Sequence, residues 1–77
     1  MTTEKKRDNI VQVLMNGYRY QAAEMAGMIT ISRDGAIIGK ARWHEDQLLE
    51  CTAVLPDEVT LALEKKIKEM VDSRYFD

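Results

Sequence analysis

The sequence predicts an α+β fold with one N-terminal helix or two short ones, a three-stranded antiparallel β-meander, and a C-terminal helix packed on one face of the sheet. From residue 29 to residue 55 the odd-numbered positions are mainly apolar and the even-numbered positions mainly polar. This period of two is that of a strand with one buried face. Turn-forming residues interrupt the stretch twice. After Pro56 the apolar spacing becomes helical.

The N-terminal part is predicted to be helical. Residues 3–16 carry apolar side chains at helical spacing, and Asn16 with Gly17 is a typical stop signal. The second half of residues 18–26 has high helix propensity and no β-branched residue, which favours a short second helix that ends at Gly27. A loop or the beginning of a long first strand is the alternative for these residues.

Two turns set the predicted register of the meander. A two-residue turn at Asp34 and Gly35 would place apolar side chains opposite polar ones. A three-residue turn over residues 33–35, with Gly35 in the left-handed conformation, keeps the apolar set on one face. The second turn, over residues 44–46, is predicted to have three residues for the same reason.

This register predicts which residues face each other across the strands. The predicted pairs are Ile31 with Ile37, Gly39 with Cys51, and Lys40 with Glu50. The last pair joins opposite charges, which favours the same register. Gly39 is expected to let a neighbour pack close to the central strand. Cys51 is predicted to be a small buried thiol, and because it is the single cysteine, a reducing cytoplasm is the expected location.

The last helix is predicted over residues 57–74. Pro56 ends the sheet because it has no N–H to donate to a strand ladder. Asp57 and Glu58 stand in the first turn, where negative charge complements the helix dipole. Its apolar stripe is predicted to cover the odd-numbered face of the sheet and consists of Val59, Leu63, Ile67, Met70 and Val71.

Size and composition predict one small domain over residues 1–77. A domain of this length is marginally stable, so self-association would help it. No apolar run is long enough to span a membrane, and the first residues lack the apolar core of a signal peptide. We therefore expect a cytoplasmic protein without a membrane partner.

No motif for catalysis, metal binding or nucleotide binding occurs. His44 is the only histidine, and it stands in a predicted turn beside Glu45 and Asp46, where three consecutive residues rarely converge on one metal ion. Glycines are too sparse for a phosphate-binding loop. The sequence therefore predicts a protein that is not an enzyme and uses no cofactor or metal.

An alternative function comes from a local pattern. Residues 10–28, with the stop signal at Asn16 and Gly17, resemble the two opening helices of helix-turn-helix DNA-binding proteins. In those proteins a recognition helix follows and often ends in tryptophan, as the next segment does at Trp43. The resemblance implies DNA binding through residues 10–43. The isoleucines and glycines after residue 28 favour a hairpin there instead.

The predicted order of elements is also similar to that of double-stranded-RNA-binding domains. That family binds RNA through a lysine cluster at the start of its last helix. Asp57 and Glu58 stand at this position, and their carboxylates would repel phosphate. The net charge of −2 adds no basic bias. Nucleic acid is therefore not the expected partner.

The even-numbered face of the meander is the predicted binding surface. Apolar residues interrupt it, and charged residues border them. The candidate protein-binding residues are Ile38, Lys40, Arg42, Leu48, Glu50 and Val54. The predicted function is a small non-enzymatic protein-binding module of the regulator, inhibitor or adaptor type, such as an accessory protein of bacteria or phages. It would act through a sheet face or edge on a protein partner, and it is predicted to form a homodimer.

Overall fold

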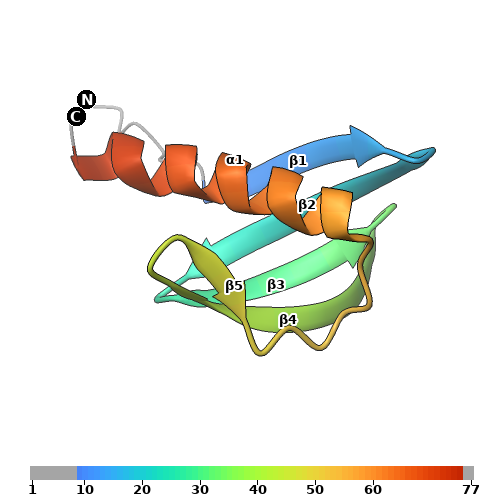
Figure 1. Cartoon of the computed structure of the whole chain (residues 1–77), viewed down its shortest axis with the longest axis horizontal. Coiled ribbons are helices and arrows are strands. Elements are labelled where there is room, and N and C mark those ends of the chain that lie inside the picture. Colours follow the sequence, from blue (N-terminus) through green and yellow to red (C-terminus); the bar gives the residue numbers. More distant parts are fainter. Residues whose placement is uncertain (1–8, 76–77) are drawn as a thin grey trace, which may run out of the picture.

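The computed structural model describes residues 9–75, and within them the chain forms five strands and one helix (Figure 1). The elements are β1 (Ile10–Met15), β2 (Tyr18–Met25), β3 (Met28–Arg33), β4 (Ala36–His44), β5 (Gln47–Leu49) and α1 (Asp57–Tyr75). Each strand pairs antiparallel with the next, so the predicted antiparallel meander is confirmed, but the described residues form five strands and not the predicted three. The sheet curves like a half-barrel, and α1 lies across its open side (Figure 1).

The predicted N-terminal helices are wrong over the part of them that the structure describes. Residues 10–15 and 18–25 are strands, while residues 3–8 of the first predicted helix lie outside the described residues. Asn-Gly between apolar segments is a strong hairpin signal, and it outweighs helix propensity here because the sheet buries alternate side chains of β2. Residues 10–43 thus form four strands, and the helix pair of the helix-turn-helix resemblance is absent.

All four hairpins use two-residue turns. The central pairs are Asn16-Gly17, Ala26-Gly27, Asp34-Gly35 and Glu45-Asp46, with φ between 50° and 91°. Positive φ at both central residues defines the type I′ turn, whose twist matches that of the flanking strands. The left-handed conformation predicted for Gly35 is confirmed, at φ 91°. The three-residue lengths predicted for the last two turns are wrong.

A β-bulge in β4 lets a two-residue turn at Asp34 and Gly35 coexist with one apolar face of the sheet, which was the reason to predict a longer turn. The pairs near this turn are Arg33 with Ala36, Ser32 with Ile37 and, past the irregularity, Ile31 with Gly39. Ile38 is the extra residue of β4, and it returns the odd-numbered side chains to the buried face. The predicted pairing of Ile31 with Ile37 is therefore wrong, and Ile37 is 68% exposed.

The chain after β4 also departs from the predicted register. β5 ends at Leu49 instead of continuing to residue 55, and Glu50 adopts φ 54°. Beyond it Thr52 takes the place opposite Lys40: the Thr52 N–H donates to the Lys40 carbonyl at 2.9 Å, and the Lys40 N–H donates to Thr52 Oγ1 at 2.9 Å. The predicted pair of Lys40 with Glu50 is wrong for two reasons. The second turn has two residues and not three, and the strand ends before Glu50, whose positive φ changes the course of the chain.

The close approach predicted at Gly39 is present, but with a different neighbour. A Cβ on Gly39 would lie 2.5 Å from the Ala53 nitrogen, so only glycine fits there. The neighbour is Ala53 and not Cys51. Cys51 is exposed, which corrects the prediction of a buried thiol, and its Sγ donates to the Ala53 carbonyl at 3.4 Å.

The core lies between α1 and the inner face of the sheet, as the alternating pattern predicts. Val59, Leu63 and Ile67 of α1 are fully buried, and α1 contacts β1, β2 and β5. The sheet contributes the buried side chains of Val13, Tyr20, Ala22, Ile29, Ile31 and Ala41. The final helix and its packing on the sheet are confirmed. The odd-numbered face is confirmed for Ile29, Ile31 and Ala41, but Ile37 and Cys51 are exposed and Leu49 lies on the outer face. Across residues 9–75, no helix is long and apolar enough to cross a membrane.

Candidate protein-binding surface

The outer face of the sheet, turned away from α1, carries several exposed apolar side chains. Alternation along the strands places them there, because their neighbours in the chain are the buried residues of the inner face. The exposed fraction is 54% for Ile10, 71% for Leu14, 70% for Met25 and 49% for Met28. The outer face of an antiparallel sheet is more often polar. This face therefore has an unusual composition for a solvated surface.

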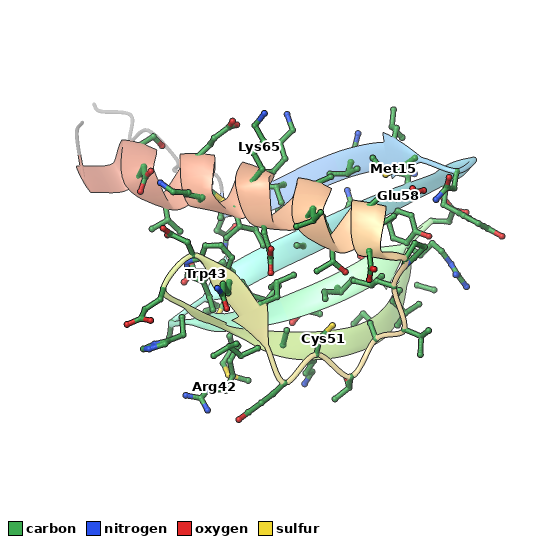
Figure 2. All side chains as sticks on the ribbon, viewed as in Figure 1. Met15, Arg42, Trp43, Cys51, Glu58 and Lys65 are labelled. Carbon is green, nitrogen blue, oxygen red and sulfur yellow. The ribbon has the colours of Figure 1, made fainter. Side chains whose placement is uncertain are left out.

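Four of the outer residues form a continuous row across the sheet, which we call the methionine row. Met25 pairs with Met28, Met28 pairs with Arg42, and Arg42 pairs with Leu49. The row thus joins four strands, β2 to β5, at the end of the sheet that holds the Ala26-Gly27 turn. Arg42 points away from α1 in Figure 2. The three apolar side chains lie beside one cation.

Arg42 is held in place by Glu50. Its Nη1 lies 3.3 Å from Glu50 Oε2 and 3.4 Å from Oε1, so the guanidinium contacts both carboxylate oxygens. Both side chains are more than half exposed, and an exposed ion pair of this kind stabilises a fold by less than about 1 kcal/mol. The pair therefore holds a positive group within the methionine row, between Met28 and Leu49, with a negative group beside it, more than it stabilises the sheet.

Four of the predicted binding residues are exposed and two are half-buried. Arg42 and Glu50 come together, and Lys40 lies on the same outer face, opposite Thr30. Val54 is 94% exposed, in the segment between β5 and α1. Ile38 and Leu48, by contrast, are half-buried and pack against the core. Substitutions at these last two positions therefore affect stability as well as any binding.

Sequence reasoning missed Met25, Met28 and Leu49. Met25 lies in the predicted second helix, and Leu49 has an odd-numbered position, which places it on the predicted buried face, whereas the two-residue second turn pairs it with Arg42 on the outer face. The signal that would have found the two methionines is the hairpin formed at Asn16 and Gly17. Once β2 is a strand, the alternation of its side chains continues into β3.

Other polar groups in the described chain offer less for chemistry. His44 Nε2 lies 3.7 Å from Glu45 Oε2, and both are exposed. No group of three or more possible metal ligands lies together among the residues with described side chains. An open depression of about 520 Å³ lies at the β1–β2 turn, where Asp34 Oδ1 already accepts the Arg19 N–H at 2.9 Å. None of these places gathers a nucleophile and a base.

Comparison with protein-family models, with curated proteins and with solved structures finds no match to this chain. A functional proposal therefore rests on the surface itself, because a fold alone does not define a function.

Proposed function

We propose that the protein is a small non-enzymatic protein-binding module, of the regulator, inhibitor or adaptor type, and that its partner docks over the methionine row. The observation that carries the proposal is the exposure of Met25 and Met28 on the outer face, next to Arg42, which is paired with Glu50 and lies between Met28 and half-buried Leu49. Methionine and arginine are both enriched at protein interfaces relative to the rest of the surface.

The side chains of the row suit this role. Methionine is unbranched and flexible, so it adapts to partner surfaces of different shape. Arg42 can donate hydrogen bonds to a partner carboxylate, and Glu50 and Lys40 supply further charges for orientation. The partner that fits is a protein with an exposed apolar patch flanked by at least one acidic group.

Site-specific crosslinking tests the proposal. A photoreactive residue is placed at position 28 in the full chain, expressed in the native host, and a matched residue is placed at position 61. Leu61 is the control because it is 65% exposed on α1, away from the methionine row. We expect a protein that crosslinks reproducibly from position 28 and not from position 61.

The captured protein is then purified and its binding measured. The double variant Met25→Glu and Met28→Glu is expected to raise the Kd at least about tenfold, because it replaces the two exposed apolar side chains of the row with charges. Leu61→Glu should leave the Kd unchanged. Circular dichroism shows whether both variants keep the fold. Absence of any specific crosslink, or equal affinity of both variants, would contradict the proposal.

A further inference from the structure

The two edges of the sheet differ in how they are protected. β5 has only three residues, and Glu64 Oε2 of α1 accepts the N–H of Leu48 at 3.0 Å. β1 has six residues, none of them charged, and in the described chain it pairs with β2 alone. Long uncharged edge strands pair readily with other strands, and proteins usually block them with charge, proline or a covering segment.

The backbone groups that β1 presents outward follow from the hairpin. Met15 and Tyr18 flank a two-residue turn, so they form a hydrogen-bonded pair. The Glu24 N–H donates to the Asn9 carbonyl at 2.8 Å, so Asn9, which is odd-numbered like Met15, also directs its backbone toward β2. The backbone N–H and C=O groups of the even-numbered residues Ile10, Gln12 and Leu14 therefore point away from β2. Within residues 9–75 no hydrogen bond to these N–H groups is found.

This edge is complementary to an antiparallel copy of itself. Centred on Gln12, such a pairing places Gln12 opposite Gln12 of the second copy, where the two outward backbones exchange hydrogen bonds. It sets Ile10 opposite Leu14 on the outer face, in both directions. On the inner face it sets Val11 opposite Val13. Every cross-strand pair is then uncharged, and the apolar pairs on both faces are of the stabilising kind.

We infer that two copies of the chain pair through β1, antiparallel about Gln12, and join their meanders into one continuous sheet. The pairing is isologous, as in most homodimers, and places both helices on the same side of the sheet. It covers Ile10 and Leu14, which are more than half exposed in the single chain. It also gives a marginally stable domain additional buried surface. The β1 edge and the methionine row share no residue, so this inference stands independently of the proposed partner surface.

The first test is the oligomeric state of the full chain. Sedimentation equilibrium should give twice the chain mass of 8.9 kDa. Gln12→Pro should give the monomer mass, because proline removes an outward N–H that β2 does not use. A wild-type monomer at the highest soluble concentration would overturn the inference. A folded Gln12→Pro variant that remains dimeric would do the same.

The second test fixes the register and does not depend on proline. Gln12→Lys and Gln12→Glu each place like charges opposite each other, so each homodimer should dissociate about fivefold more readily. Mixing the two variants should restore a dimer of wild-type affinity through a Lys–Glu pair. Gln21→Lys is the control: Gln21 Nε2 bonds to Gln12 Oε1 at 3.3 Å, but Gln21 lies on β2, away from the edge. Failure of the mixture to recover would exclude pairing about Gln12.

Discussion

At the residue scale, the four turns differ in how well their residues suit positive φ. Ala26 adopts φ 53°, a region that costs most residues with a side chain about 1 kcal/mol or more. Asparagine tolerates this conformation and is preferred at the first central position of a type I′ turn. The Glu24 carboxylate supports this turn by accepting the Gly27 N–H at 3.0 Å. The turn thus holds one residue in an unfavourable conformation.

We therefore expect Ala26→Asn to increase the free energy of unfolding by about 0.5 kcal/mol. Gly27→Ala is the matched control, since its φ of 83° is unfavourable for alanine although the space around it is open. It should destabilise by about 1 kcal/mol. Urea denaturation measures both changes. A less stable Ala26→Asn variant would show that the alanine is not strained.

At the element scale, β5 depends on α1. A three-residue strand is too short to be stable alone. Glu64 binds the Leu48 N–H, and Lys68 Nζ lies 3.9 Å from Asp46 Oδ2 in the β4–β5 turn. The hydrogen bond to Asp72, followed by the charges of Asp72 and Asp46, raises the pKa of Lys68. Its attraction to them is full below the ordinary pKa and is lost only as pH rises through the raised value.

Removing the Glu64 carboxylate should release β5. Glu64→Ala leaves the partly buried Leu48 N–H without its acceptor, which costs about 1–3 kcal/mol. Amide hydrogen exchange at Leu48 should become faster, while exchange in β2 and β3 changes less. Glu69→Ala, at an exposed position of the same helix, is the control. Unchanged exchange at Leu48 would mean that other contacts hold the strand.

At the scale of the whole molecule, α1 completes the core. Leu63 is fully buried, whereas Leu61, two residues earlier, is 65% exposed. Leu63→Ala should lower the free energy of unfolding by about 2–5 kcal/mol, since it leaves a cavity between helix and sheet. This is a large part of the roughly 4–12 kcal/mol expected for a domain of this length. Leu61→Ala should change it by less than about 0.5 kcal/mol.

Urea denaturation of the two leucine variants measures this difference. If the two losses were equal, α1 would not pack as described. The same arrangement limits where binding can occur, because α1 occupies the inner face of the sheet and leaves the outer face exposed.

The sequence by itself determined the features that depend on neighbouring residues. Pro56 and the acidic first turn define the beginning of α1, and its apolar stripe defines the buried face. The alternation around Ile31 identified β3 as a strand with one buried face. A glycine at position 39 indicated a close approach of two backbones. Each of these signals is local, so no knowledge of the rest of the chain was needed to interpret it.

Only the tertiary structure decided the features that depend on distant partners. At residues 18–25 two local signals conflict, the hairpin signal at Asn16 and Gly17 and the helix formers of the segment, and the burial of Ala22 and Tyr20 against other strands and α1 decides for a strand. The bulge at Ile38 and the end of β5 were likewise not predictable, because either turn length satisfies the local rules. These choices placed Ile38 and Leu48 against the core and brought Met25 beside Met28 and Arg42. Register is set by which arrangement buries the most apolar surface across the whole sheet.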